Sequence, residues 1–429
     1  MRFLHIADVH LGYKQYGSEE RLRDFAQAFK DAVKYGVEKK VDFIIIAGDL
    51  FHKKSEVDPL TLTQATKVLE IPKKAEIPVI AVEGNHDSTY FKDRFSWMDY
   101  LAANEYLINL KPSFDNGILV EEWDGENGAY VDIGETRIYG MKYYGSLTEK
   151  ILEEYSKKIK KRKFTIFVAH VGIEGYMNIY GCIPSSKLHK LKDRVDYVAL
   201  GHIHKSFVED FIFNPGSLET CDAAEYQFKR GAFLVDYDGE IRHKFVEFPK
   251  REFYFLECDV KSYDDLKTFL KNQDRSKIQN SVLHLTLKAN KSVKKMLDDL
   301  KLQKIVKEIL NPLVVRVKWD IVDEMFEPIL DLKAKKSIEA QVIEQLLDSF
   351  PYGNIAEEVL RLKTILSTSY DVKSVDTFIE SILSRKLSRK TSKKTNNTDK
   401  VRKMINKKDE DYEWEWWKVN DRRGRASKR

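Results

Sequence analysis

The chain has little cysteine. Three cysteines, Cys182, Cys221 and Cys258, are spread over 429 residues without Cys-x-x-Cys spacing. This distribution argues against a disulfide framework and against a zinc site made of thiolates. We therefore interpret all three as small apolar side chains that the folded core buries.

Long apolar runs are also missing. No stretch of the sequence reaches the apolar length that a membrane-spanning helix needs. The N-terminus starts with R-F-L-H-I-A, a strand-like pattern, and not with the basic and then apolar segments of a signal peptide. These features predict an intracellular protein without a membrane partner, located in the cytoplasm or nucleoid if the source is prokaryotic.

Charge is unevenly distributed along the chain. The formal net charge is +5, but residues 385–429 contain 17 Lys and Arg against 7 Asp and Glu, which gives the tail +10 and leaves −5 for the rest. We expect this tail to be disordered and to add non-specific affinity for a polyanion. Its acidic and aromatic insert, Asp409 to Trp417, could equally be a short partner-binding segment.

Short apolar runs predict an α/β domain over residues 1–249. Runs rich in Ile, Val and Phe predict buried strands at residues 2–8, 41–47, 78–83, 164–169 and 195–200. Helical patterns separate these runs, and the first helix is expected to begin near Ser18. Alternating segments between 111 and 145, with turns at Asp124-Gly125 and Gly134-Glu135, favour hairpins there.

Two further units precede the tail. Residues 250–330 predict a small α+β domain with strands at 253–258, 282–287 and 313–317 and helices at 263–271, capped by Ser262, and 293–310. Residues 331–384 predict helices with two apolar stripes, which either pack on the body or bind a partner protein. The stripes are Ile338, Val342, Leu346 and Phe350, then Ile355, Val359, Leu362 and Leu366 behind a capping box at Asn354 and Glu357.

Five short motifs stand where predicted strands end. They are D-V-H-L-G (8–12), G-D-L-F-H (48–52), G-N-H-D (84–87), A-H-V-G (169–172) and G-H-I-H (201–204). The carboxyl ends of strands in an open α/β sheet meet at one crevice, so motifs that are distant in sequence can meet there. Each motif alone is weak evidence, but the five in this placement strongly favour one site.

The motifs supply seven side chains that can bind metal: two carboxylates, one amide and four imidazoles, from Asp8, His10, Asp49, Asn85, His170, His202 and His204. Seven donors are too many for one ion, but they suit two ions that share a carboxylate and leave positions open for water and phosphate. Oxygen and imidazole donors without thiolate favour Mn²⁺, with Mg²⁺, Fe and Zn²⁺ as alternatives. Glycines before Asp49, Asn85 and His202 allow tight turns and close approach.

Other residues near the motifs leave alternatives open. His86 directly follows a predicted ligand, and its imidazole could protonate a departing alkoxide or stabilise phosphoryl charge. Asp87 either supports the turn at Asn85 or orients a ligand. The histidines outside the motifs are interpreted as ordinary core or surface residues: His5, His189, His243 and His284.

The motifs, in this order, resemble those of the calcineurin-like metallophosphoesterases, and more narrowly those of the double-strand-break repair nucleases called Mre11 in archaea and eukaryotes and SbcD in bacteria. The narrower resemblance lies in H-I-A-D-V-H-L-G-Y (5–13), I-A-G-D-L-F-H (46–52), E-G-N-H-D (83–87), G-M-K-Y (140–143), A-L-G-H-I-H-K (199–205) and N-P-G-S-L-E (214–219). It covers the first half of the chain and implies a four-layer αββα sandwich. The later segments match only in layout, as a DNA-capping domain and helices that bind a partner ATPase.

The resemblance also implies roles for individual residues. One ion would be held by Asp8, His10, Asp49 and His204, and the other by Asp49, Asn85, His170 and His202, with Asp49 bridging. His86 would assist the leaving group, and His52 would place the phosphate for exonucleolytic cutting, unless it is simply a loop residue near the metals. The implied activity is a Mn²⁺-dependent 3′→5′ exonuclease on duplex DNA ends with single-strand endonuclease activity.

Partners follow from the same resemblance. It implies a homodimer formed by helices near 61–69 and 91–101, where Phe95, Trp97, Met98 and Leu101 either supply an apolar interface or pack in the core. It also implies an SMC-like ABC ATPase (Rad50 or SbcC) bound by helices at about 333–384. The tryptophans of the basic tail have no counterpart in the resemblance.

DNA contacts are expected close to the metals. Tyr13, Lys14 and Tyr16 follow the first ligand pair, and Lys53 and Lys54 follow His52. Their alternative is a set of solvated loop residues. Two other functions also remain open: a small-molecule phosphodiesterase that acts on cyclic nucleotides, and a subunit that mainly tethers DNA to an ATPase.

Overall fold

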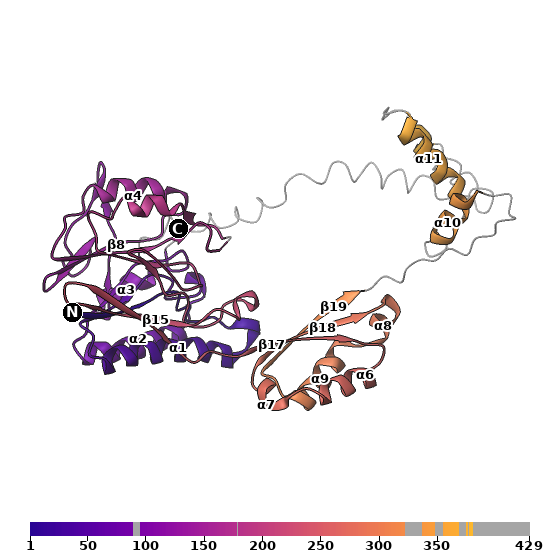
Figure 1. Cartoon of the computed structure of the whole chain (residues 1–429), viewed down its shortest axis with the longest axis horizontal. Helices are drawn as coiled ribbons and strands as arrows, with labels where there is room; N and C mark the ends of the chain where they lie inside the picture. Colours follow the sequence, from indigo (N-terminus) through magenta and orange to yellow (C-terminus); the bar gives the residue numbers. More distant parts are fainter. Residues whose placement is uncertain are drawn as a thin grey trace, which may run out of the picture. The chain divides into compact units, whose positions relative to one another are not determined.

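The computed structural model describes residues 1–88, 95–177, 179–321, 337–347, 355–368, 375 and 377–380. The chain divides into two compact units, Met1–Asp323 and Glu324–Arg429, which are described separately (Figure 1). The predicted basic tail, Phe350 and Asn354 lie outside the described residues. Within those residues, no helix combines the length and the apolar character that crossing a bilayer would require.

Two six-stranded sheets form the centre of the first unit. The first sheet has the order β16-β15-β1-β2-β3-β4, in which β1 to β4 are parallel. Its strands are β1 (Arg2–Ile6), β2 (Phe43–Ile46), β3 (Val79–Ala81), β4 (Ile108–Asn109), β15 (Gly231–Tyr237) and β16 (Ile241–Glu247). The second sheet has the order β13-β14-β12-β9-β8-β7. Its strands are β7 (Tyr130–Ile133), β8 (Thr136–Met141), β9 (Phe164–His170), β12 (Tyr197–Gly201), β13 (Phe207–Glu209) and β14 (Ile212–Asn214).

Both faces of the first sheet are buried, as its continuous apolar strands predict. On β2, Ile44 and Ile46 enter the core that the sheet shares with its helices, whereas Phe43 and Ile45 enter a core between the two sheets. This division follows from the alternation of side chains along a strand. The five strands predicted in residues 1–249 are all present, as β1, β2, β3, β9 and β12, so this prediction is confirmed.

Helices cover the outer faces of the sheets and complete the predicted αββα sandwich. The first sheet packs against α1 (Glu19–Glu38), α2 (Pro59–Lys74) and α3 (Trp97–Ala103), and the second against α4 (Thr148–Ser156) and α5 (Ser185–His189). In Figure 1, α1 and α2 lie on one side of the sheets and α4 on the other. Helix α1 begins where predicted because Ser18 accepts a hydrogen bond from the Arg21 amide.

The helix expected to supply a dimer interface is partly a core element. Met98 and Leu101 of α3 have no exposed surface and pack in the core, so they are not available to a partner. Phe95, just before the helix, is 61% exposed, and Leu60 at the start of α2 is 52% exposed. Residues 91–94 of the predicted interface lie outside the described residues.

Shorter elements connect the sheets. They are the strands β5 (Ser113–Phe114), β6 (Ile118–Leu119), β10 (Gly172–Ile173) and β11 (Cys182–Ile183) and the 3-10 helices η1 (Gln15–Gly17), η2 (Lys54–Glu56), η3 (Gly145–Leu147) and η4 (Ala223–Glu225). The predicted hairpin at Gly134-Glu135 joins β7 to β8. The turn expected at Asp124-Gly125 is present, since the Asp124 carboxylate accepts the amides of Glu126 and Asn127, but it does not join two named strands as a hairpin would.

A small parallel sheet follows the sandwich within the first unit. Its strands are β17 (Phe253–Asp259), β18 (Val282–Ala289) and β19 (Val314–Ile321). The helices α6 (Tyr263–Lys271), α7 (Arg275–Ile278), α8 (Lys291–Met296) and α9 (Asp299–Leu310) accompany it. The single helix expected at 293–310 is wrong, because Asp298 accepts the Lys301 amide and starts a second helix after an extended Leu297.

Ion pairing joins this sheet to the sandwich. Arg251, just before β17, donates to the Asp24 carboxylate of α1 through Nε at 2.8 Å and Nη2 at 2.5 Å. The backbone amide of Arg251 donates to Glu219, whose other oxygen accepts from the buried Arg21 at 3.2 Å. Tyr16 Oη lies 3.2 Å from His284 Nε2 on β18.

In the second unit, α10 (Ile338–Leu347) and α11 (Ala356–Thr368) are the described helices. They contact each other through an ion pair between Lys363 and Glu339. The predicted apolar stripes are only partly used in this packing. Val342, Ile355, Val359 and Leu362 are half-buried, whereas Ile338, Leu346 and Leu366 are exposed.

Candidate metal centre

Loops from both sheets bring the five motifs together. The loops after β1, β2 and β3 supply Asp8, Asp49 and Asn85, while the end of β9 and the loop after β12 supply His170 and His202. The first two loops are joined by backbone hydrogen bonds, from Asp8 N to Gly48 O at 3.1 Å and from His10 N to Asp49 O at 3.0 Å. Across the sandwich, the His202 amide lies 3.0 Å from both oxygens of Asp8.

Asp49 lies between two groups of donors. One of its oxygens is 3.2 Å from His170 Nε2, and the other accepts the His86 amide at 2.9 Å. On its other side, ligand atoms of Asp8, His10 and Asp49 all lie within 4.8 Å of one another. A carboxylate in this position can be shared by two cations.

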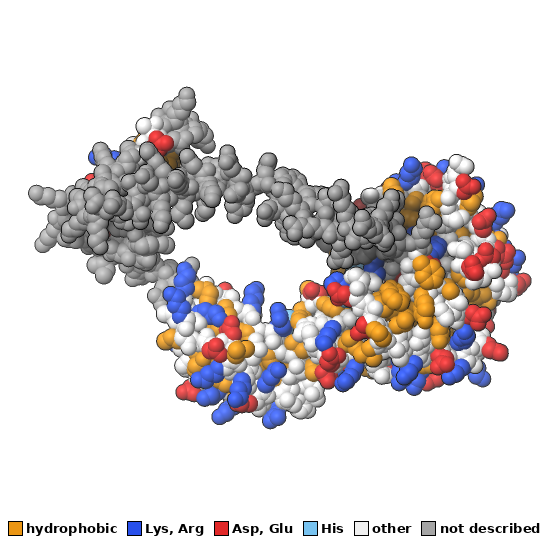
Figure 2. Space-filling view, turned by 180° about the vertical axis from the view of Figure 1, so that it is seen from behind, with side chains coloured by type: hydrophobic (Ala, Val, Ile, Leu, Met, Phe, Trp, Pro, Cys, Tyr) orange, Lys and Arg blue, Asp and Glu red, His pale blue; other side chains and the backbone are white. Residues whose placement is uncertain are grey.

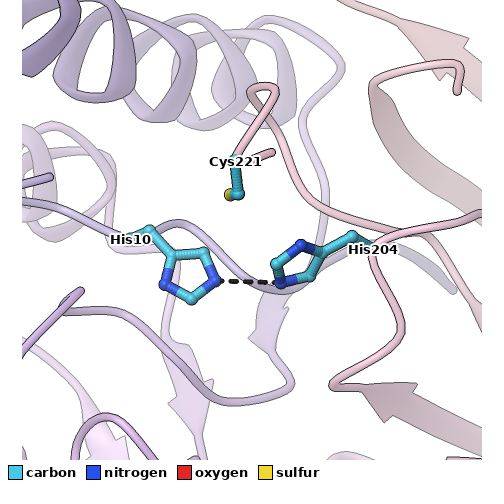
Figure 3. Close-up of side chains that lie close together, drawn as sticks. All are labelled: His10, His204 and Cys221. Atoms are coloured by element: carbon cyan, nitrogen blue, oxygen red, sulfur yellow. Dashed lines mark hydrogen bonds between the residues drawn. The ribbon is translucent and has the colours of Figure 1, made fainter. Parts of the chain in front are cut away.

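The first group contains His10 and His204. Their Nε2 atoms are 3.1 Å apart (Figure 3), a separation typical of two ligands on one cation. His204 is oriented by Glu225, which accepts from His204 Nδ1 at 2.8 Å and is itself bound by Arg230 at 3.0 Å. A histidine that donates one ring nitrogen to a carboxylate presents the other as a metal ligand.

The second group contains Asn85, His170 and His202. Asn85 Oδ1 lies 3.1 Å from both His170 Nε2 and His202 Nδ1. The opposite ring nitrogens are occupied, since His170 Nδ1 donates to Ala47 O at 2.8 Å and His202 Nε2 donates to the Tyr180 carbonyl. When both imidazoles are neutral, the inward nitrogens therefore carry lone pairs, and a cation between them and the amide oxygen would satisfy all three.

Together the two groups fit a dinuclear centre. Asp8, His10, Asp49, His170 and His202 are almost completely buried, and a cation offsets the desolvation of the two carboxylates. The donors are oxygens and imidazole nitrogens, which suit Mn²⁺, Fe or Zn²⁺. All seven predicted ligands meet at this site, and their assignment as ligands remains a prediction.

The backbone of the centre is strained at several of these residues. Asp8, His10, Asp49 and His202 have φ angles of 50°, 52°, 52° and 84°, in the left-handed region that residues other than glycine rarely occupy. Such conformations cost about 1–3 kcal/mol each and are concentrated at functional sites. Here the strain directs side chains from three loops towards one point, since Asp8 and His10 share the loop after β1.

Glycine is required where the loops approach each other, as the sequence predicts. A Cβ on Gly48 would lie 2.2 Å from His170 Nδ1, and one on Gly84 would lie 2.0 Å from Asp49 Oδ1. Gly48 also has a φ angle of 89°. No other residue would leave these ligands in place.

Burial and neighbouring charge shift the pKa values of the centre. Burial raises the pKa of Asp8 to about 6 and lowers the pKa values of His52 and His202 to about 4. Burial alone would also lower the pKa of His170, but the Asp49 carboxylate outweighs it and raises that pKa to about 9. In the metal-free protein, the Asp49 charge is therefore balanced by a proton on His170.

His86 and His52 lie beside the first group. The ring of His86 is 5.1 Å from that of His10, and its Nδ1 is hydrogen-bonded to the His52 carbonyl. His52 stacks on Tyr13 at 3.7 Å between ring centroids, and its Nδ1 is buried without a partner among the described residues. Both predicted catalytic histidines thus lie within reach of a substrate at the metals.

Asp87 supports the loops that carry two of the ligands. Its carboxylate accepts the amides of Leu50 at 3.1 Å, Phe51 at 2.9 Å and Gly84 at 3.1 Å. Burial raises its pKa to about 7. The side chain therefore holds the turn at Asn85 and also fixes that turn against the loop of Asp49, so the two roles considered for it are compatible.

The residues predicted to bind DNA differ in how exposed they are and in what they contact. Lys14 and Lys53 are exposed and form ion pairs with Glu19 and Glu56, whereas Lys54 is bonded to the Ser88 carbonyl. Tyr16 points towards the β18 side, where Arg316 lies 5.5 Å from its ring centre. Figure 2 shows basic and acidic side chains interspersed on the visible face of the first unit, so that face presents no continuous basic surface.

Several residues of the centre were not found from the sequence. Glu225 and Arg230 carry no motif, and their role depends on a contact with His204 that only the folded chain creates. Tyr143 belongs to the G-M-K-Y motif, but its proximity to His202, 5.7 Å between rings, was not foreseen. The prediction for cysteine holds for the buried Cys258, whereas Cys182 and Cys221 are only half-buried.

Comparisons with known proteins find similarity over the part of the chain that carries this site. A family model described as "Calcineurin-like phosphoesterase" matches residues 1–206. A protein from Archaeoglobus fulgidus named "DNA double-strand break repair protein Mre11" is 33% identical over 63% of this chain and 64% of its own length. Proteins of the same name from Methanocaldococcus jannaschii and Sulfolobus acidocaldarius are 32% and 24% identical, over 56% and 69% of this chain and 63% and 77% of their own lengths. The chain thus matches less than two thirds of the Archaeoglobus protein.

Proposed function

We propose that the chain belongs to the calcineurin-like metallophosphoesterases and, within them, to the Mre11 family, and that it is a nuclease that acts on DNA ends in double-strand-break repair; the similarities to that family support this proposal. The observation that carries the proposal is the meeting of two donor groups around Asp49, one with His10 and His204 and one with His170 and His202. This centre suits a phosphodiester, whose non-bridging oxygens two cations can hold together.

Two Mn²⁺ ions are the proposed cofactors, with Mg²⁺, Fe or Zn²⁺ as alternatives. Asp8, His10, Asp49 and His204 would hold one ion, and Asp49, Asn85, His170 and His202 the other. When bound, the ions supply Lewis acidity and a hydroxide nucleophile near neutral pH. The protein contributes fixed imidazole tautomers, set by Glu225, the Ala47 carbonyl and the Tyr180 carbonyl.

His86 is the proposed proton donor to the leaving oxygen. Its Nδ1 is hydrogen-bonded to the His52 carbonyl, which leaves Nε2 as the atom for the substrate. The ring of His52 is held between His86 and Tyr13 and would position the phosphate. Proton transfer of this kind typically contributes about 10²–10⁴-fold to the rate.

The proposed substrates are duplex DNA ends, cut by 3′→5′ exonuclease action, and single strands, cut endonucleolytically. Tyr13, Lys14, Tyr16, Lys53 and Lys54 remain the proposed DNA contacts. The exposed apolar residues Ile338, Leu346 and Leu366 are proposed to bind an SMC-like ABC ATPase, and Phe95 and Leu60 to contribute to a homodimer. The protein would act inside the cell, where its DNA substrate lies.

A comparison of His86→Ser with His189→Ser tests the catalytic role. His189 is a matched control, because it bonds to the Ser185 carbonyl away from the metal ligands. Full-length protein with Mn²⁺ would be given labelled linear duplex DNA, a DNA hairpin and 2′,3′-cyclic AMP. We expect cutting of DNA by the native and His189→Ser proteins and a loss of about 10²-fold or more in His86→Ser, with Mn²⁺ binding unchanged.

Three results would contradict the proposal. Undiminished cutting by His86→Ser would remove the assigned proton donor. Rapid hydrolysis of 2′,3′-cyclic AMP without DNA cutting would favour a small-molecule phosphodiesterase. If mutation of the metal ligands left full biological activity and the binding of DNA and the ATPase intact, the protein would instead be mainly a tethering subunit.

A further inference from the structure

One thiol lies beside the metal centre and has no place in the proposed ligand set. Ligand atoms of Cys221, His10 and His204 all lie within 4.8 Å of one another. Figure 3 shows Cys221 above the gap between the two imidazole rings, whose Nε2 atoms are 3.1 Å apart. Cys221 is half-buried, so an ion arriving from solvent can reach its sulfur.

The backbone around Cys221 is fixed on both sides. Gln15 Nε2 donates to the Cys221 carbonyl at 2.7 Å, and Arg21 Nη2 donates to the preceding Thr220 carbonyl at 3.0 Å. The Thr220 amide is in turn held by Glu219 at 2.7 Å. The thiol therefore belongs to a rigid loop, and its place near the two histidines does not depend on a mobile surface segment.

The distances suit a shared cation. A thiolate sulfur and an imidazole nitrogen on one five-coordinate zinc ion lie roughly 3.1–3.8 Å apart, given bonds of about 2.3 and 2.1 Å. The three ligand atoms all lie within 4.8 Å of one another, which is close to that spacing. Its present contact, an S–H donated to the Glu219 carbonyl at 3.5 Å, is weak and easily exchanged.

We propose that Cys221 is a further ligand on the His10–His204 side of the centre and gives that side a preference for thiophilic ions such as Zn²⁺ or Co²⁺ over Mn²⁺. The inference rests on the proposed dinuclear centre. Thiolate donors select softer cations, whereas the other group offers only an amide oxygen, a carboxylate and two imidazoles. The thiol proton passes to solvent water as the metal–sulfur bond forms. The two metal positions are then chemically unequal.

Cobalt absorption tests the proposal without relying on nuclease activity. Thiolate ligation of Co²⁺ produces a charge-transfer band in the near ultraviolet that oxygen and nitrogen ligands do not. Metal-free full-length protein, Cys221→Ser and Cys258→Ala would be titrated with Co²⁺, and then with Zn²⁺ and Mn²⁺ in competition. Cys258 is a matched control, because it is buried in the core of the β17–β19 sheet.

We expect the band in the native and Cys258→Ala proteins and its loss in Cys221→Ser. The Cys221→Ser protein should also bind Zn²⁺ about tenfold more weakly with Mn²⁺ affinity unchanged. A band that persists in Cys221→Ser, or native protein that binds Co²⁺ without the band, overturns the ligand role of Cys221 but leaves the two-metal centre intact. Native protein that binds no divalent ion would overturn both the centre and this inference.

Discussion

Glu225 acts on the centre through His204, which it orients at 2.8 Å while Arg230 holds it in place. A Glu225→Gln protein keeps the shape of the side chain but loses the charge that fixes the imidazole. We expect metal affinity to fall about 10–100-fold, as is usual when a partner of a metal-bound histidine is changed. Calorimetric titration with Mn²⁺ measures this effect. Glu149→Gln, which removes an exposed partner of Lys187, should bind Mn²⁺ like the native protein.

Metal uptake should depend on pH because protons compete with the cations for His170 and Asp8. The metal-free protein keeps a proton on His170 up to about pH 9 and on Asp8 up to about pH 6. A cation must displace the His170 proton near neutral pH, so affinity should rise as pH increases towards 9 and fall further below 6. Calorimetry in buffers of different ionisation enthalpy would detect the released proton. Binding heats that do not depend on the buffer would contradict this expectation.

From the sequence, the metal-binding side chains of this centre are easier to locate than the residues that orient them. Asp8 and Asp49 follow parallel strands of one sheet, which bring their carboxyl ends to one edge, so their meeting is predictable. His170 ends a strand of the other sheet, and its approach to them depends on how the two sheets pack. The contact between His204 and Glu225 depends on how an irregular loop folds back, and no periodicity or spacing encodes it. The place of Cys221 beside His10 was missed for the same reason.

At the scale of elements, buried strands were predicted well because a run such as F-I-I-I in β2 has no polar face. The helix at 293–310 was predicted as one element because its apolar spacing continues through the break. The structure separates it at Asp298, whose side chain accepts the Lys301 amide. The side-chain cap therefore sets the boundary between α8 and α9, which the hydrophobic pattern does not reveal.

This cap makes a prediction about α9. An Asp298→Ala protein should lose about 1 kcal/mol of local helix stability, since an unsatisfied amide would be exposed at the helix start. Hydrogen exchange of the first α9 amides should become roughly fivefold faster. Glu308→Ala, which changes an exposed residue in the same helix, should leave these amides as protected as before. Equal exchange in native and Asp298→Ala proteins would show that the cap does not hold the boundary.

At the scale of the whole molecule, chelation of the metal should lower stability. The ions bind only the folded centre, so they stabilise the protein by about 2.7 kcal/mol when their free concentration is 100 times the dissociation constant. Thermal unfolding with EDTA should therefore occur at a lower midpoint than with Mn²⁺, and the midpoint should rise with Mn²⁺ concentration. Asp49→Asn protein should lose this dependence. A midpoint in native protein that EDTA leaves unchanged would argue against bound ions.

The donors come from loops of both sheets: Asp49 follows β2 of one, and His170 ends β9 of the other. Cations between them would act as a cross-link between the two sheets, in addition to apolar side chains such as Ile45 and Val168 and hydrogen bonds such as the one from His170 Nδ1 to Ala47 O. Metal binding would then make the protein active and strengthen the contact between its two sheets at the same time. A molecule that has lost its ions would be inactive and also easier to pull apart between these sheets.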